Sequence, residues 1–192
     1  MLIETGRRAK AASRVLALAS TETKNAALRA LAEALAAARV DILSANAHDV
    51  DQARSGGLSE ALIDRLLLND KRIDGLCADL LHLVELPDPV GQHFDQTILP
   101  NGMRLRKQHV PLGVLGVIYE SRPNVTMDVA GLAIKTGNAA ILRGGSETIH
   151  SNRALVKIIQ QTLGAAGLPA ETIQFIDSPD RGLVLELLTL HD

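Results

Sequence analysis

Apolar side chains in the first 85 residues recur at spacings of three and four, which is the period of an amphipathic helix. Ala12 and Leu16 belong to one such stripe, and Leu31 and Leu35 to the next. The pattern predicts four helices, at about Ile3–Leu18, Thr23–Ala38, Val40–Arg54 and Lys71–Glu85. Between the third and the fourth, a Ser-Gly-Gly break precedes Ser59, which is a candidate helix N-cap. These helices carry no recognisable chemistry of their own.

The next segment of the chain alternates apolar and polar positions. His93–Leu99, a Pro-Asn-Gly turn and Met103–Lys107 together give the signal of a β-hairpin. Arg104 and Arg106 would point to the face opposite Leu105. Because an isolated two-stranded ribbon is only marginally stable in water, the hairpin is expected to lie against the rest of the chain or against a neighbouring subunit.

From residue 112 onward, apolar strands and amphipathic helices alternate. The expected strands are Gly113–Tyr119, Ala139–Leu142 and Ile173–Ile176, and the expected helices are Val125–Thr136, Glu147–Leu163 and a last helix that opens at Ser178-Pro179. The first strand is almost continuously apolar, as expected for a parallel strand buried on both faces. Gly137 is predicted at a helix C′ position, and Ser178 and Pro179 at the N-cap and N1 positions of the last helix. The alternation predicts a doubly wound α/β unit with its ligand crevice at the carboxyl ends of the strands.

Composition narrows the class of protein. With 192 residues, 46% of them hydrophobic, the chain can bury a sizeable core. A formal net charge of -2 and an aromatic content of 2% without tryptophan disfavour nucleic acid and anionic membranes as partners. The charged N-terminus and the absence of a long apolar run predict a cytoplasmic protein, and the single Cys77 fits a reducing compartment. The histidines show no paired spacing, so no metal site is expected.

Charged and polar residues follow the first parallel strand directly. Glu120, Arg122 and Asn124 lie at its carboxyl end and lead into a helix whose free N–H groups can meet an anion. Two interpretations stay open from position alone. Asn124 can simply cap the helix while the charges are solvated, or these side chains can contact a ligand.

The second strand ends in a glycine pair. In Arg143–Glu147 the backbone of Gly144 and Gly145 can approach a phosphate or a ribose, while Arg143 supplies a positive charge and Glu147 an acceptor for hydroxyl groups. The pattern matches neither a Walker loop nor the dinucleotide fingerprint. A purely structural Gly-Gly turn therefore remains an alternative to a cofactor contact.

Two stretches of the chain resemble the gamma-glutamyl phosphate reductases, a family of the aldehyde dehydrogenase superfamily. They are Val110–Thr126, which includes Tyr-Glu-Ser-Arg-Pro-Asn, and Lys135–Glu147, which includes Lys-Thr-Gly-Asn and Arg-Gly-Gly-Ser-Glu. The similarity extends over essentially the whole chain, through Ala45–Val50, Leu58–Leu66, Asp88–Gly91 and Ser178–Arg181. The resemblance implies N-terminal helices, a β-hairpin arm and a Rossmann-like parallel βαβαβα unit, which together form an incomplete aldehyde dehydrogenase-like cofactor domain.

The resemblance also implies a reaction: NADPH-dependent reduction of L-glutamate 5-phosphate to the 5-semialdehyde, with release of phosphate, in proline biosynthesis. In such enzymes a cysteine thiolate attacks the acyl phosphate and the thioester accepts a hydride. The implied cofactor-binding residues are Arg143, Gly144, Gly145, Ser146 and Glu147, and the candidate substrate-binding residues are Glu120, Arg122, Asn124 and Thr126. Arg143 corresponds to the lysine that contacts the adenosine ribose in the superfamily, and it could also favour a 2′-phosphate.

The sequence departs from the family in one respect. The family's nucleophilic cysteine lies in a catalytic domain in the second half of its proteins, and its motif is absent from these residues. Cys77 lies on an amphipathic helix between two aspartates that oppose thiolate formation, so it is expected to be structural. The chain is therefore expected to be an N-terminal segment that is inactive alone.

The resulting hypothesis divides the chain into a helical part at 1–92, an oligomerisation arm at 93–109 and an NADP-binding unit at 110–192, which would form a homo-oligomer. Two alternatives stay open. The chain can be a non-catalytic nucleotide-binding or assembly module, or part of another reductase of the superfamily that acts on an acyl phosphate or an aldehyde.

Overall fold

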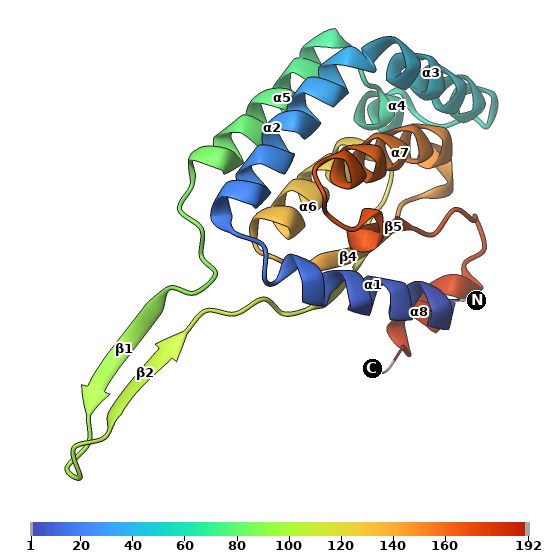
Figure 1. Ribbon diagram of the computed structural model, residues 1–192. Coiled ribbons are helices and arrows are strands. Elements are labelled where there is room, and N and C mark those ends of the chain that lie inside the picture. The colour runs from blue at the N-terminus through green and yellow to red at the C-terminus, as the bar shows by residue number, and fades with distance from the viewer. Residues whose placement is uncertain (1, 191–192) are drawn as a thin grey trace.

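The computed structural model describes residues 2–190. Five helices come first, followed by a hairpin and then by alternating strands and helices (Figure 1). The elements are α1 (Leu2–Leu16), α2 (Thr21–Ala37), α3 (Arg39–Ser55), α4 (Glu60–Leu66), α5 (Asp70–Glu85), β1 (His93–Ile98), β2 (Arg104–Gln108), β3 (Val114–Ile118), α6 (Asn124–Lys135), β4 (Ala139–Arg143), α7 (Ile149–Ala165), β5 (Ile173–Phe175) and α8 (Gly182–Leu188). The predicted α/β class with a preceding helical part and a hairpin is confirmed.

Polar side chains set where the early helices begin. The Ser20 hydroxyl accepts a hydrogen bond from the Thr23 backbone N–H at 3.1 Å, so α2 starts two residues before its predicted first residue. The Asn69 side chain accepts a hydrogen bond from Arg72 N–H at 2.9 Å, and α5 starts at Asp70. Ser59 is the N-cap of α4, as predicted, although its side chain makes no capping bond. The four predicted early helices are confirmed to within two residues at either end.

The parallel sheet has the order β3-β4-β5, with Val114 opposite Ala139 and Ala140 opposite Ile173. Helices α6 and α7 cover one face, and α1 and α8 cover the other (Figure 1). All five residues of β4 are buried, as expected for a central strand. The expectation that β3 is buried on both faces is wrong: within the described residues β3 pairs only with β4, and Ile118 is 44% exposed.

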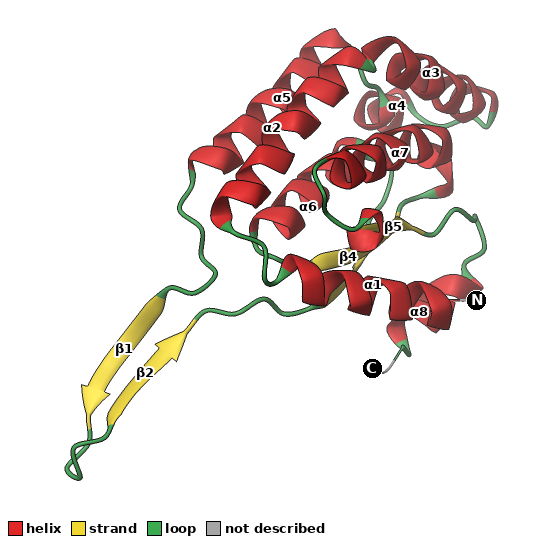
Figure 2. Cartoon of the chain, in the orientation of Figure 1, coloured by secondary structure: helices red, strands yellow, loops and turns green. Residues whose placement is uncertain are grey.

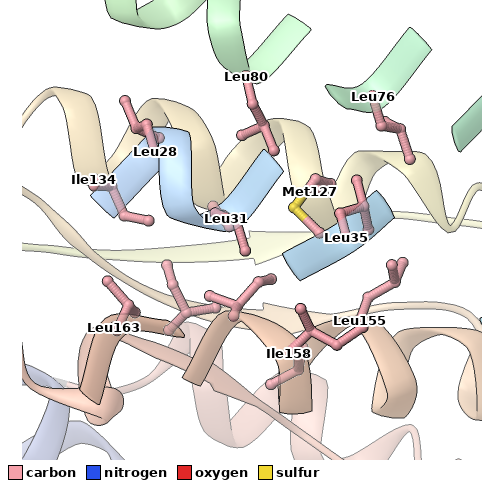
Figure 3. Close-up of a cluster of buried hydrophobic side chains, with 14 of the residues drawn as sticks. Leu28, Leu31, Leu35, Leu76, Leu80, Met127, Ile134, Leu155, Ile158 and Leu163 are labelled. Carbon is pink, nitrogen blue, oxygen red and sulfur yellow. The ribbon is translucent and has the colours of Figure 1, made fainter. Parts of the chain in front are cut away.

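The main core lies between the helices and the sheet. Figure 3 shows its side chains converging from four helices: Leu28, Leu31 and Leu35 of α2, Leu76 and Leu80 of α5, Met127 and Ile134 of α6, and Leu155, Ile158 and Leu163 of α7. A smaller cluster on the other face of the sheet joins α1 and α8 to β4. The helical part and the strands therefore share one continuous core, which fixes the strand ends relative to α2 and α5.

Gly137 ends α6 as predicted. Its φ of 74° lies in the left-handed region, and the N–H of Asn138 donates to the Ala133 carbonyl at 2.9 Å, as in a Schellman cap. The Asn138 side chain then accepts a hydrogen bond from Gly113 N–H at 2.9 Å. The end of α6 is thus tied to the start of β3 beside β4.

Two predicted helix starts are wrong. A short 3-10 turn occupies residues 146–148, so α7 begins at Ile149 rather than at Glu147. The last helix begins at Gly182, after the N-cap Arg181, and not at Ser178-Pro179. The Ser178 hydroxyl accepts from Asp180 N–H at 3.2 Å and the Asp180 carboxylate accepts from Gly182 N–H at 2.8 Å. These local bonds hold the segment in turns that compete with a helix.

The hairpin projects away from the rest of the fold and its strands form a sheet of their own (Figure 2). Every residue of β1 and β2 is exposed, including Ile98 at 69% and Leu105 at 50%. Gly102, with a φ of 83°, closes the predicted Asn-Gly turn. A bulge follows Phe94, and Asp95 there has a φ of 50° and an ion pair with Lys107 at 2.8 Å.

Candidate functional site

The loops that follow β3 and β4 meet at the carboxyl end of the sheet. The Tyr119 N–H donates to the Arg143 carbonyl at 3.0 Å, which extends the β3–β4 pairing by one residue. A Cβ atom added to Gly145 would lie 3.5 Å from the Ser121 backbone nitrogen. The structure therefore brings the two sequence-predicted segments, 120–126 and 143–147, side by side, where a ligand crevice is expected.

A chain of buried hydrogen bonds holds these loops together. The Tyr119 and Thr126 hydroxyls lie 2.5 Å apart, and Thr126 Oγ1 donates to Asn152 Oδ1 at 2.7 Å. Asn152 Nδ2 then donates to Thr148 Oγ1 at 2.8 Å, and Thr148 Oγ1 donates to the Gly145 carbonyl at 3.0 Å. Each side-chain polar atom of these four residues has a partner in the network, which makes it rigid.

Thr126 has a different position from the one expected of a substrate contact. Its side chain is fully buried and its hydroxyl contacts Tyr119 and Asn152. In this arrangement Thr126 positions the loop that precedes it. Burial, partly opposed by the hydrogen bond with Thr126, raises the pKa of Tyr119 to about 12, so its phenol stays protonated at neutral pH.

Gly144 is required for close packing inside this network. A Cβ atom there would lie 2.2 Å from Asn152 Nδ2 and 3.3 Å from both Thr148 Oγ1 and Tyr119 Cε2. Any side chain would push Asn152 away from Thr126 and Thr148. The first glycine of the pair therefore serves the packing of the two loops, and Gly145 lies nearer the surface.

Arg143 ends β4 with its side chain inside the protein, where it is 8% exposed. Nη1 donates to the Gly144 carbonyl at 2.6 Å and Nη2 donates to the Pro179 carbonyl at 3.3 Å. Its buried Nε has no hydrogen-bond partner, and among the described residues no carboxylate lies within 4.0 Å of the guanidinium. A buried guanidinium without a counter-charge is unusual, and a bound anion would compensate it.

The two polar residues after the glycine pair lie on the 3-10 turn. Ser146 is exposed and donates its hydroxyl to Glu147 Oε1 at 3.2 Å. Glu147 is half-buried, and one of its carboxylate oxygens would lie 2.4 Å from a Cβ at Gly145. The structure thus keeps Ser146 and Glu147 together, next to the loop that follows β3.

The N-terminus of α7 is already occupied by a side chain of the protein. Asp49 of α3 is 1% exposed and accepts hydrogen bonds from His150 N–H at 3.1 Å and Ser151 N–H at 2.8 Å. In many dinucleotide-binding folds a pyrophosphate takes these N–H groups. That position is closed here, and the sequence pattern gave no indication of it.

The remaining predicted residues surround the first turn of α6. Glu120 and Arg122 are exposed, and Pro123, not Asn124, is the helix N-cap, so the interpretation of Asn124 as the cap is wrong. Asn124 Nδ2 instead donates to Asp128 Oδ2 at 3.2 Å. The reason is that the fixed φ of Pro123 is already helical, which starts α6 one residue earlier.

Arg122 and Asn124 face a cleft of about 450 Å³ between α6 and the helices α4 and α5. Arg65, Asp79 and Asp128 also line it, and sequence analysis did not single out any of the three. Burial raises the pKa of Asp128 and the nearby Asp79 raises it further, whereas the bond from Asn124 lowers it. The cleft thus combines both signs of charge at the predicted substrate-binding loop.

The environment of Cys77 does not favour an activated thiolate. Its side chain is half-buried on α5, and Sγ donates to the Ala32 carbonyl at 3.4 Å. Burial raises the pKa of the thiol, Asp74 adds to this, and Arg39 acts in the opposite direction. Such a thiol is a weak nucleophile at neutral pH. Among residues 2–190, no three His, Cys, Asp or Glu side chains come together as a metal site, and no helix is long and apolar enough to cross a membrane.

Comparison with known proteins shows which sequences the chain is similar to. The chain is 56% identical over 189 residues to gamma-glutamyl phosphate reductase of Tolumonas auensis, covering 98% of this chain and 45% of that protein. It is 54% identical over 191 residues to the protein of the same name from Vibrio vulnificus. No family model matches the chain. The chain spans about half the length of the curated relatives that it matches.

Solved structures agree with the sequence relatives. The crystal structure of gamma-glutamyl phosphate reductase from Thermotoga maritima superposes with a TM-score of 0.95 at 43% identity, over 98% of this chain and 46% of that one. The protein of the same name from Saccharomyces cerevisiae gives 0.85 at 30% identity, over 96% of this chain and 52% of that one. A probable aldehyde dehydrogenase from Listeria monocytogenes, at 0.73 and 15% identity, shares the fold. The chain is therefore homologous to the gamma-glutamyl phosphate reductases and corresponds to their N-terminal part.

Proposed function

We propose that this chain supplies the cofactor side of an enzyme that reduces L-glutamate 5-phosphate to L-glutamate 5-semialdehyde, with release of phosphate, in proline biosynthesis. The observation that carries the proposal is the 56% identity to a gamma-glutamyl phosphate reductase over 98% of the chain. The packed loops at the carboxyl end of the sheet support it, because both predicted segments meet there.

The cofactor proposed is NADPH, which supplies the hydride when bound. Arg143 fits an anionic group of such a cofactor because its buried guanidinium has an unpartnered Nε and no carboxylate beside it. Its charge suits a 2′-phosphate, and Ser146 and Glu147 could hydrogen-bond ribose hydroxyls. Because Asp49 closes the N-terminus of α7, we expect the remaining phosphates to lie elsewhere.

On the substrate side, Arg122 and Asn124 are the side chains that reach an open cleft, and Glu120 is exposed on the same loop. Thr126 supports this loop from inside through Tyr119 and Asn152. The covalent step implied by the family needs an activated thiolate, and Cys77 has the opposite environment. We therefore propose that the nucleophile comes from outside these 192 residues and that the chain alone has no measurable reductase activity.

The hairpin is proposed to be an assembly arm of a homo-oligomer. Its strands are exposed along their whole length and carry apolar side chains, among them Phe94, Ile98 and Leu105. A ribbon of this kind gains stability when it packs on another surface. The helices in residues 1–92 and the α/β unit in residues 110–192 are then proposed to form the cofactor side together.

The reaction is best tested in a protein that joins these 192 residues to the remaining part of the Tolumonas auensis relative (the joined protein). In the reverse direction, L-glutamate 5-semialdehyde, phosphate and NADP⁺ should give the acyl phosphate, NADPH and a proton. The increase in NADPH absorbance measures this turnover. The aldehyde loses two electrons as hydride, and phosphate forms the new acyl bond.

Two controls separate the alternatives. Turnover that does not need phosphate would indicate another reductase of the superfamily. A joined protein that binds NADPH but never turns over would favour the non-catalytic module, and the absence of both would refute the proposed function.

A further inference from the structure

The cleft beside α6 is shaped by three segments that are distant in sequence. It lies between α4, α5 and the β3–α6 loop, and its volume of about 450 Å³ is in the range of small-molecule sites. Leu67, Leu68 and Leu76 provide apolar walls. The same loop approaches Gly145 through the Ser121 backbone, so the cleft adjoins the proposed cofactor loops.

The charged residues of the cleft are only partly paired with one another. Asp64 and Arg72 form an ion pair at 2.9 Å and compensate each other. Within the described residues, the side chains of Arg65, Arg122 and Asp79 form neither an ion pair nor a hydrogen bond. The cleft therefore offers two cations and, with Asp128, two carboxylates to a ligand.

Gly75 is a second feature that points to an occupant. It lies inside α5, where glycine costs about 0.5–1 kcal/mol relative to alanine. A Cβ atom at this position would have nothing within 4 Å, so no packing contact requires the missing side chain. Gly75 lines the cleft, and its lack of a side chain leaves room there.

We propose that this cleft binds the amino-acid end of the substrate, with its ammonium group at Asp128 and Asp79 and its carboxylate at Arg122 and Arg65. This inference rests on the proposed function and assigns its substrate recognition to a defined subsite. A zwitterionic group matches two carboxylates and two cations that form no ion pair within the described residues, whereas a phosphate or a dinucleotide would meet repulsion from Asp79 and Asp128. Asn124 orients Asp128 through its 3.2 Å hydrogen bond.

The direct test uses the 192-residue chain with L-glutamate and glutarate as probes, followed by amide chemical shifts. Glutarate keeps both carboxylates of glutamate but lacks the ammonium group. We expect L-glutamate to shift the amides of the cleft and glutarate to bind roughly 10- to 100-fold more weakly. Equal responses to both probes, or no response of the cleft amides to L-glutamate, would refute the proposal.

Two variants and a matched control separate binding from folding. Asp128→Asn keeps the shape of the side chain and should abolish the preference for glutamate over glutarate. Gly75→Leu should block the cleft without lowering the melting temperature, because the added side chain enters open space and leucine favours helix. Gly164→Leu adds the same side chain to α7, where a Cβ likewise has nothing within 4 Å, and should bind glutamate normally. Glutamate binding that survives Gly75→Leu would contradict the inference.

Kinetics of the joined protein distinguish this inference from the proposed function. With L-glutamate 5-semialdehyde, Asp128→Asn should raise KM by roughly 10- to 100-fold, while the KM for 5-oxopentanoate, which lacks the amino group, stays unchanged. If Asp128→Asn raised KM equally for both aldehydes, the subsite would be refuted while the proposed reaction would stand. Glutamate binding in the cleft without any turnover would refute the reaction alone.

Discussion

Asp49 and Ser151 are 102 residues apart in sequence, and the Asp49 carboxylate accepts both the backbone N–H of Ser151 at 2.8 Å and its hydroxyl at 2.5 Å. Asp49 also accepts the N–H of His150, so a side chain of α3 serves as the cap of α7. Asn46, one turn earlier on α3, donates to Ser151 Oγ at 3.0 Å and to the Leu66 carbonyl at 2.9 Å. The helical part thereby fixes the start of the helix that carries Asn152.

Removing this cap should destabilise the whole fold. Asp49→Ala leaves two backbone N–H groups and a buried hydroxyl without their acceptor, and we expect a loss of about 2–4 kcal/mol in the free energy of unfolding. Urea denaturation measures it. Asp51→Ala on the same helix changes an exposed residue and should have little effect. Equal effects of the two substitutions would show that Asp49 does not cap α7.

Tyr119 can be titrated directly because it is the chain's single tyrosine and tryptophan is absent. Phenolate absorbance should give a pKa raised from 10.0 to about 12, since burial disfavours the ionised ring. The folded pKa lies above the unfolded one, so Tyr119 makes the free energy of unfolding fall as pH rises through this interval. Tyr119→Phe should remove that part of the pH dependence. A midpoint near 10 in the folded chain would mean that the ring is solvated.

Local sequence signals predicted most helices and strands correctly, because these elements depend on residues a few positions apart in the sequence. The stripes of α2 and α5, the Asn-Gly hairpin and the glycine after α6 each reflect spacing or backbone conformation within a few residues. Arg143 and Gly144 were also singled out from sequence, since a glycine pair after a strand is a local pattern, and their contact with a cofactor stays a prediction. The helix start expected at Ser178 failed because side-chain bonds of Ser178 and Asp180 form turns instead.

The features that sequence could not predict depend on tertiary contacts. Thr126 has no local signal that separates a ligand contact from a buried partner of Asn152. Asp79 and Asp128 come from different helices and meet only after α5 packs on α6. The apolar run of β3 was correctly identified as a strand, but its exposure depends on which strands pair with it.

The buried ion pair of Lys24 and Asp88 should make stability depend on pH in the acid range. Their charged atoms lie 2.6 Å apart, and the Thr21 hydroxyl and the Val90 backbone N–H also donate to the carboxylate. Burial alone would raise the pKa of Asp88, but these bonds outweigh it and lower the pKa from its ordinary 3.8. This stabilisation is present above pH 3.8 and is lost as pH falls below it through the folded pKa.

Comparing the wild type with Asp88→Asn tests this pair. At neutral pH the substitution leaves the buried Lys24 ammonium without a counter-charge, and we expect a loss of about 3–5 kcal/mol. The difference should shrink in denaturation curves recorded below pH 3.8. Asp95→Asn, which alters an ion pair exposed on the hairpin, should have little effect at any pH. A difference that does not vary with pH would rule out linkage through Asp88.

The hairpin should determine the assembly of the joined protein. Replacing Ile98 and Leu105 with lysine places charge on apolar positions that are 69% and 50% exposed in the single chain. If the arm packs on another subunit, the double substitution buries charge there and should lower the mass in solution, measured by light scattering. Val40→Lys, at an apolar position on α3 that is 78% exposed, is the control. An unchanged mass, also after deletion of 97–107, would refute the assembly role.

Arg143 should control the choice between NADPH and NADH. Its guanidinium donates to the carbonyls of Gly144 and Pro179, so any substitution disturbs packing as well as charge. The affinity ratio of the two cofactors separates these effects, because misplaced loops would weaken both alike. In the joined protein, Arg143→Gln should lower the preference for NADPH by about 1–3 kcal/mol, or roughly 5- to 150-fold, if a charge-assisted contact to the 2′-phosphate is lost. Asn124→Ala, on the neighbouring loop, should lower kcat and leave that ratio unchanged. Fluorescence titration with each cofactor measures this affinity ratio. An equal loss of affinity for NADPH and NADH in Arg143→Gln would mean that Arg143 serves only the packing of the loops.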